Sequence, residues 1–199
     1  AYKRKKRYAF LNGKVIEIDE ETTKNLVNVI EDFNLDEKNL SKEVINPFFN
    51  VLKVKNYQNL SSFEIEDKLG NVLDEINRYK ESLFEPNEKM KEIMRPYQIE
   101  AFKWLRVLHK YNFGGVLADD MGLGKTVQTL ALLQKQNEML KEADHARTSL
   151  LVLPTSLVYN WQKEAEKFAP SLRLLIHTGS NRHKDPLTFA KYDVVITTY

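Results

Sequence analysis

Between positions 119 and 126, two glycines, a lysine and a threonine lie close together, and all of these residue types suit the binding of phosphate groups. Gly122 and Gly124 have no side chain, so the backbone can turn tightly there and point its amide groups inward. Lys125 adds a positive charge, and Thr126 adds a hydroxyl. This combination suits a polyphosphate, because the lysine would reach the β- and γ-phosphates of a nucleotide and the threonine hydroxyl would coordinate Mg²⁺.

The general phosphate-loop pattern begins with a glycine five residues before the Gly-Lys-Thr triplet, at the position that Asp119 occupies here. The strict pattern therefore fails at its first residue. A strand predicted before the loop and a helix predicted after it still favour nucleotide binding over a glycine-containing turn with a chance lysine. We predict that Lys125 and Thr126 act catalytically, that Thr126 holds Mg²⁺, and that the nucleotide contacts Asp120, Met121, Gly122, Leu123, Gly124, Lys125, Thr126 and Val127.

The elements that must position this loop alternate between strand and helix from about residue 95 onward. Apolar residues recur at helical spacing between Pro96 and Tyr111, and again beyond residue 154. A third helix is predicted to run from near Gly124 to Ala143. Short apolar runs predict strands over residues 113–118, 150–153, 172–176 and 194–197. This alternation predicts an α/β fold in which a parallel sheet has helices on both faces.

Residues 1–85 differ from the rest of the chain in composition, since they are charged, rich in asparagine and poor in continuous apolar runs. Asn12-Gly13 suits the tight turn of a hairpin between strands at residues 7–11 and 14–18. Apolar residues at helical spacing predict two later helices, one around residues 26–33 and one around 69–76. We predict a small α+β extension of unknown role over residues 1–85 and a nucleotide-binding domain over residues 86–199.

Composition excludes several classes of site. The chain has 199 residues, a formal net charge of +2 and no cysteine, which rules out disulfides, thiolate metal sites and cysteine nucleophiles. Its four histidines show no compact metal-ligand spacing. The apolar runs are too short to cross a bilayer and no signal peptide precedes them, so we expect an intracellular protein without a membrane partner. The basic run at residues 3–7 is interpreted as a solvated terminus rather than a phosphate contact.

Four ordered stretches resemble motifs of one family. They are Ile93–Gln98 with Phe102–Leu105, Gly115–Gln128, Leu151–Trp161 and Asp193–Tyr199. In this order they are similar to the Swi/Snf-type (sucrose non-fermenting) ATPases, helicase-like DNA translocases of superfamily two, and to a bacterial member in particular. That family carries an aspartate at the position of Asp119, so the departure from the general pattern supports the resemblance.

The resemblance implies the first, RecA-like P-loop lobe of such a motor, incomplete here, with ATP and Mg²⁺ as cofactors. It assigns Gln98 to the adenine edge, with Arg95 bracing the nucleotide. It also implies that duplex DNA is held by its backbone, through Pro154, Thr155, Ser156, Thr197 and Thr198. A helix cap is the alternative at residues 155–156, and ordinary strand-end polarity is the alternative at 197–198. Tyr97, Trp104 and Trp161 are interpreted as core residues.

The function implied is that of the ATP-binding part of a DNA-dependent ATPase, or hydrolase, that translocates on duplex DNA, as chromatin remodellers do. A strand-separating DNA or RNA helicase is one alternative. A regulatory module whose residues 1–85 dock a protein partner is another. No Asp-Glu motif follows the fourth strand and no second RecA-like lobe with its arginine finger is matched, so we expect the chain to bind ATP but hydrolyse it inefficiently. We expect a cytoplasmic or nucleoid location in a bacterium, and a nuclear one in a eukaryote.

Overall fold

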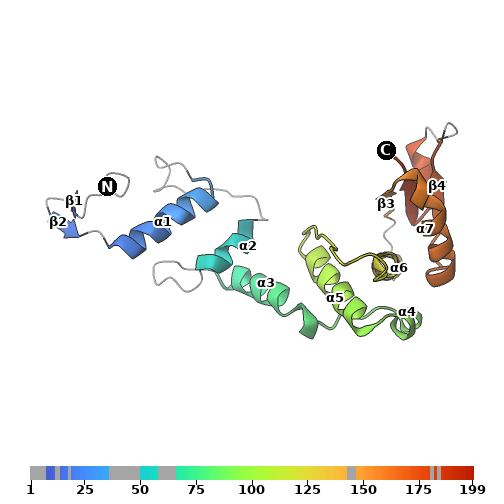
Figure 1. The fold of residues 1–199 in the computed structure, drawn as a ribbon, viewed down its shortest axis with the longest axis horizontal. Coiled ribbons are helices and arrows are strands. Elements are labelled where there is room, and N and C mark those ends of the chain that lie inside the picture. The colour runs from blue at the N-terminus through green and yellow to red at the C-terminus, as the bar shows by residue number, and fades with distance from the viewer. Residues whose placement is uncertain are drawn as a thin grey trace. The chain divides into compact units, whose positions relative to one another are not determined.

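A computed structural model describes most of the chain, namely residues 8–11, 14–17, 19–35, 50–57, 66–142, 147–179, 182 and 185–199. The chain divides into two compact units, Ala1–Leu73 and Asp74–Tyr199, and the boundary falls inside one helix, α3 (Asp67–Asn77; Figure 1). The predicted division at residue 85 stays a prediction, although residues 74–85 pack within the second unit. None of the described helices is long and apolar enough to cross a membrane.

The first unit contains the predicted hairpin strands and helices. Strands β1 and β2 pair antiparallel, with Leu11 opposite Lys14. The Asn12-Gly13 turn lies outside the described residues, as does the basic run at residues 3–7. The ends of two elements meet where the hydroxyl of Tyr57 donates to the carboxylate of Asp32. Burial, followed by this hydrogen bond, raises the pKa of Tyr57 to about 12. Its elements are β1 Tyr8–Leu11, β2 Lys14–Glu17, α1 Glu20–Asp32, α2 Val51–Val54 and η4 Lys55–Tyr57, and the unit ends within α3 Asp67–Asn77.

The second unit is a parallel sheet with helices, as predicted. The strand order is β3-β5-β4, and both pairings are parallel. The central strand β5 is buried, and its Val194 and Ile196 join apolar residues from α4, α5, α6 and α7 in one core. A buried central strand packed against the apolar faces of helices is what a parallel α/β sheet requires. The elements are η5 Tyr79–Glu81, α4 Glu88–Ile93, α5 Pro96–Lys110, α6 Lys125–Glu142, β3 Ser149–Val152, α7 Thr155–Phe168, β4 Leu174–His177, η6 Pro186–Lys191 and β5 Val194–Thr197.

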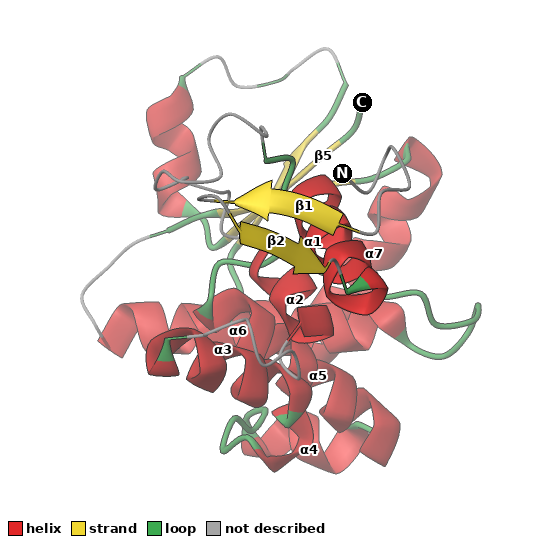
Figure 2. Ribbon diagram, turned by 90° about the vertical axis from the view of Figure 1, so that its left-hand side faces the viewer, coloured by secondary structure: helices red, strands yellow, loops and turns green. Residues whose placement is uncertain are grey.

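The strand predicted over residues 113–118 is absent, so that prediction is wrong for this structure. The segment has no regular secondary structure and is drawn as loop in Figure 2. It lies against α5 instead, since a methyl group at Gly115 would come within 2.9 Å of Trp104 and 2.8 Å of Leu108. A strand needs a neighbour for its ladder hydrogen bonds, and among the described residues only β5 pairs with β3. The adjacent glycines 114 and 115 further weaken a strand.

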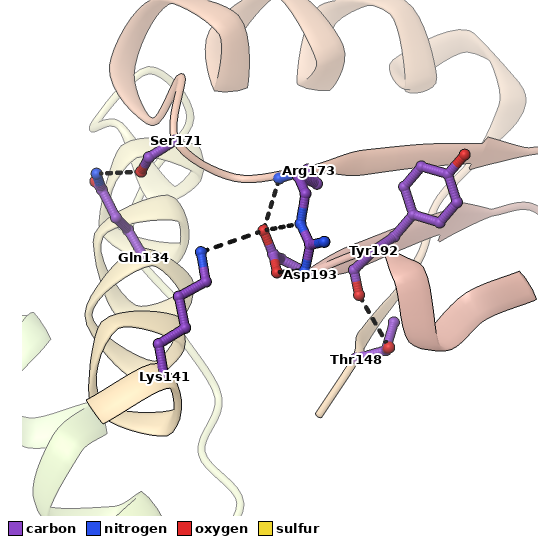
Figure 3. Close-up of polar contacts among 7 residues, drawn as sticks. All are labelled: Gln134, Lys141, Thr148, Ser171, Arg173, Tyr192 and Asp193. Atoms are coloured by element: carbon purple, nitrogen blue, oxygen red, sulfur yellow. Dashed lines mark hydrogen bonds and ion pairs between the residues drawn. The ribbon is translucent and has the colours of Figure 1, made fainter. Parts of the chain in front are cut away.

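A buried carboxylate ties β5 to the chain that enters β4. Asp193 is 5% exposed, and its oxygens accept hydrogen bonds from the backbone N–H and the guanidinium of Arg173, each at 2.8 Å (Figure 3). The ammonium of Lys141 lies 4.0 Å away. Burial raises the pKa of Asp193, but the hydrogen bonds from Arg173 and the positive charges of Lys141 and Arg173 together more than offset that effect, so the pKa lies below its usual value.

We expect Asp193→Asn to lower the free energy of unfolding by about 1–3 kcal/mol at neutral pH, because it weakens these bonds. The pKa is depressed in the folded state, so the stabilisation is present above the unfolded pKa and is lost as pH falls through the folded pKa. Urea unfolding at neutral pH and at about pH 3 checks this, since the difference in free energy of unfolding between the variant and the original chain should be smaller in acid. An equal difference at both pH values would contradict the stabilising role of the Asp193 carboxylate.

Candidate nucleotide-binding site

The loop before α6 has the backbone that the two glycines were predicted to give. Gly122 and Gly124 have φ angles of +85° and +77°, in the left-handed region that other residues rarely adopt. Helix α6 begins at the next residue, Lys125, and the N–H of Gln128 bonds to the carbonyl of Gly124 at 3.2 Å. The loop therefore passes directly into a helix N-terminus, where unpaired N–H groups and the helix dipole favour an anion.

Lys125 and Thr126 occupy the first turn of α6, and both are half-buried. The ammonium of Lys125 lies 2.5 Å from the carbonyl oxygen of Asp119 and 2.9 Å from that of Asp120. It is thus held at the loop by carbonyl groups, and it forms no ion pair with a carboxylate of the described residues. Such an ammonium can turn toward a phosphate without breaking an ion pair. The two side chains fit the triphosphate and Mg²⁺ that the sequence predicts.

A metal site made by the protein alone is not found in the described part of the chain. No three histidine, aspartate or glutamate side chains there gather closely enough to hold a cation. Mg²⁺ is usually bound by one or two protein oxygens together with substrate phosphates and water. The Mg²⁺ role of Thr126 therefore depends on a bound nucleotide, and it stays a prediction.

The first turn of α5 braces the loop from the other side. The amide of Gln98 accepts a hydrogen bond from the N–H of Arg95 at 2.8 Å and donates one to the carbonyl of Leu123 at 2.9 Å. The hydroxyl of Tyr97 donates to the same carbonyl at 2.9 Å. Both ends of the Gln98 amide are therefore engaged, and only 7% of the residue is exposed.

These contacts change two interpretations made from the sequence. Tyr97 is not a core residue: it is 37% exposed and binds the loop through its hydroxyl. The predicted adenine contact of Gln98 stays a prediction, and it requires the amide to exchange its bond to Leu123 for one to the base. Arg95 lies at the start of the same helix with its side chain exposed, so it can reach a ligand at the loop only from outside the core.

Gln128 belongs to the site although sequence reasoning gave it no role. Its side chain is fully buried, and its Nε2 donates to the carboxylate of Asp119 at 2.9 Å. A sequence signal did exist: position 128 lies one helical turn from Ala131 and two from Gln134, on the buried face of α6. A glutamine on such a face needs a polar partner, and a carboxylate nine residues earlier in the loop provides it.

The residues predicted to meet DNA gather at the carboxyl edge of the sheet. Strand β3 ends beside β5, because the N–H of Leu153 bonds to the carbonyl of Thr197 at 2.9 Å. Thr155 and Ser156 follow at the start of α7 with exposed side chains. The capping alternative fails for them, since Pro154 is the N-cap residue and no side chain caps the helix. Ligands of open parallel sheets bind outside this edge.

The two threonines at the end of β5 differ in their hydrogen bonds. The hydroxyl of Thr197 donates to the carbonyl of His177 at 2.9 Å, which ties β5 to β4. The hydroxyl of Thr198 accepts from the guanidinium of Arg182 at 2.9 Å, and the Thr198 carbonyl accepts from the same nitrogen at 3.1 Å. Arg182 is exposed and was not singled out from the sequence. It brings a positive charge to the edge where the predicted DNA contacts lie.

Comparison with known proteins finds relatives that match about half of this chain. A putative ATP-dependent helicase/translocase, YwqA, of Bacillus subtilis is 43% identical over 110 residues, which are 53% of this chain and 12% of that protein. A mouse protein named SWI/SNF-related matrix-associated actin-dependent regulator of chromatin subfamily A containing DEAD/H box 1 is 36% identical over 53% of this chain and 11% of its own length. The chain thus spans only about an eighth of either relative.

A solved structure titled Sulfolobus solfataricus SWI2/SNF2 ATPase core in complex with dsDNA is 41% identical, covers 59% of this chain and 24% of the other, and has a TM-score of 0.47. Residues 97–199 match the SNF2-related domain. That match covers more than half of the chain and includes the loop, α6 and the strand ends described above. The chain therefore belongs to the family of SNF2-related domains.

Proposed function

We propose that this chain is the ATP-binding part of a DNA-dependent ATPase that translocates on duplex DNA. The ATP assignment rests on one observation. At the N-terminus of α6, the ammonium of Lys125 bonds to a loop in which Gly122 and Gly124 have left-handed backbone conformations. The curated relatives support the rest, because their names describe an ATP-dependent helicase/translocase and a regulator of chromatin.

Each group at the loop has a defined task in this proposal. The amides of the loop and of the first turn of α6 bind phosphate oxygens. Lys125 neutralises charge on the β- and γ-phosphates, and the Thr126 hydroxyl supplies one ligand to Mg²⁺. Tyr97 keeps the Leu123 carbonyl fixed while Gln98 turns toward the adenine. The bound Mg²⁺ would supply charge stabilisation for phosphoryl transfer.

We further propose that the chain alone hydrolyses ATP slowly. Phosphoryl transfer to water needs a group that orients the water, and an arginine finger raises the rate by ~10³ to 10⁵. Neither has a match among the motifs of these 199 residues.

Two assays test the proposal. Calorimetry should detect MgATP binding to the chain, and steady-state hydrolysis should stay near background with or without duplex DNA. Hydrolysis at the rate of an intact motor would contradict the slow-turnover proposal.

In the full-length protein, unwinding of a forked duplex would favour a strand-separating helicase. Loss of partner binding after deletion of residues 1–85, with ATPase activity unchanged, would favour an interaction module.

The DNA edge makes a separate prediction. Thr198→Val removes the hydroxyl that fixes Arg182 at that edge, and we expect it to weaken binding of a labelled DNA duplex roughly two- to tenfold, the value of one hydrogen bond. MgATP affinity should not change. Thr148→Val is the matched control, because its hydroxyl donates to the carbonyls of Phe189 and Tyr192 at the opposite end of the strands. Equal DNA affinity for Thr198→Val and the unaltered chain would remove Thr198 from the DNA contacts.

A further inference from the structure

Asp119 raises a problem for a loop that binds phosphate. A carboxylate stands where the general pattern has a glycine, and a negative charge pointing at a polyphosphate would repel it. The structure shows where this charge goes. Its Oδ2 accepts a hydrogen bond at 2.9 Å from Nε2 of Gln128, a residue with 0% of its surface exposed. The carboxylate is therefore directed at a fully buried amide of α6.

Gln128 contacts the loop at two points. Its side chain binds Asp119, and its backbone N–H bonds to the carbonyl of Gly124, the left-handed glycine before α6. Asp119 is in turn held at two points, since its carbonyl accepts from the ammonium of Lys125 at 2.5 Å. The first and last residues of the turn are thus both joined to the first turn of α6, Asp119 through the side chains of Gln128 and Lys125 and Gly124 through a backbone hydrogen bond.

The amide oxygen of Gln128 indicates that this residue does more than fill space in the core. Its Oε1 is buried and has no hydrogen-bond partner among the described residues. A half-satisfied buried amide costs stability, and an apolar side chain of the same size would avoid that cost. Folding alone thus favours an apolar residue at this position, whereas the bond to Asp119 requires a donor there.

We propose that Gln128 is a positioning residue of the phosphate loop: it holds the Asp119 carboxylate against α6 and so keeps that charge away from the bound phosphates. This inference rests on the proposed ATP-binding function and adds a residue to it. Gln128 acts through Asp119 and does not touch the nucleotide itself. A second buried glutamine of α6 provides the comparison, because Gln134 also has one bonded nitrogen and one unpartnered oxygen but binds Ser171 (Figure 3).

The test measures MgATP affinity by calorimetry and thermal stability by circular dichroism. Gln128→Met is expected to weaken MgATP binding about tenfold, the value of one hydrogen bond to a charged group, without lowering the melting temperature. Gln134→Met should leave MgATP affinity unchanged, because its partner Ser171 lies outside the loop. Equal affinity for Gln128→Met and the unaltered chain would overturn the proposal.

An exchange of donor and acceptor gives a second readout. Gln128→Glu sets two carboxylates against each other, and we expect a larger loss of affinity than for Gln128→Met. Adding Asp119→Asn lets the new amide donate to the new carboxylate, so affinity should return to within about threefold of the original. If the double variant binds no better than Gln128→Glu, the Asp119–Gln128 bond is not the cause. If Gln128→Glu fails to fold, the MgATP affinities of Gln128→Met and Gln134→Met still test the positioning role of Gln128.

The outcomes separate this inference from the function on which it rests. If the unaltered chain binds MgATP and Gln128→Met binds it equally well, only the positioning role is overturned. If the unaltered chain does not bind MgATP, the proposed function fails and the positioning role fails with it.

Discussion

Lys125→Ala is expected to weaken MgATP binding by at least about a hundredfold, because it removes charged hydrogen bonds to two phosphates. The melting temperature should stay within about 2 °C of the original, as for most surface changes in a chain of this size. The reason lies in the contacts of the side chain: its ammonium bonds to the carbonyls of Asp119 and Asp120 and supports no core residue. Calorimetry and thermal unfolding measure the two quantities on the same sample.

Lys135→Ala is the matched control for this change. Lys135 lies on the same helix, and its ammonium pairs with Glu138 at 3.7 Å, away from the loop. The control removes one positive charge from α6 without touching the site, so MgATP affinity should be unchanged. If both variants weaken MgATP binding to the same extent, long-range charge and not a local contact explains the loss. If neither variant weakens it, Lys125 does not contribute to binding. Either result would show that the assignment of Lys125 is wrong.

Gly124→Ala should be the second most damaging change. Its φ of +77° disfavours any side chain, and a methyl group would lie 2.5 Å from Nε2 of Gln98. The left-handed conformation alone costs about 1–2 kcal/mol. The methyl would also displace the amide that bonds to Leu123. We expect MgATP binding to fall by about tenfold or more and the free energy of unfolding to fall by about 1–3 kcal/mol.

Four further variants separate the two causes. Gly122→Ala and Gly179→Ala also introduce a methyl at positive φ, but each points it into open space, and Gly179 lies outside the loop. Gly179→Ala should therefore cost stability only, whereas Gly122→Ala should cost stability and some affinity. Adding Gln98→Ala to Gly124→Ala removes the clash, so stability should partly recover. Gln98→Ala alone measures the cost of losing the Gln98 hydrogen bonds, and no recovery in the double variant after that cost is subtracted would show that backbone strain alone is responsible.

Local patterns predicted most of the second unit well. Pro96 and the apolar spacing that follows it predicted α5, and the observed helix is Pro96–Lys110. The short apolar runs predicted β3, β4 and β5 to within about two residues. The helix was predictable because one buried face imposes a period on its sequence, and the strands were predictable because each is a short continuous apolar run. The two loop glycines were predicted for the same kind of local reason, since only a positive φ requires them.

Predictions failed where the outcome depends on a distant partner. Residues 113–118 are apolar enough for a strand, but they lie against α5 and have no ladder partner in the described residues. Tyr97 fits the apolar stripe of α5, yet its hydroxyl is bound by a carbonyl 26 residues later. The bond between Gln128 and Asp119 and that between Arg182 and Thr198 also join separate segments. A single sequence shows the residue types but not these pairings.

The most direct test of the account maps where MgATP binds. In a nuclear magnetic resonance titration of the isotope-labelled chain, the account predicts that amide shifts concentrate at residues 119–128, with smaller shifts at Arg95 and Gln98. The largest changes should fall on Gly122, Gly124 and Lys125. The same unit has a cavity of about 650 Å³ lined by Ser82, Phe84 and Lys110, among others. Shifts gathered there, or no shifts at the loop, would contradict the claim that this loop binds ATP.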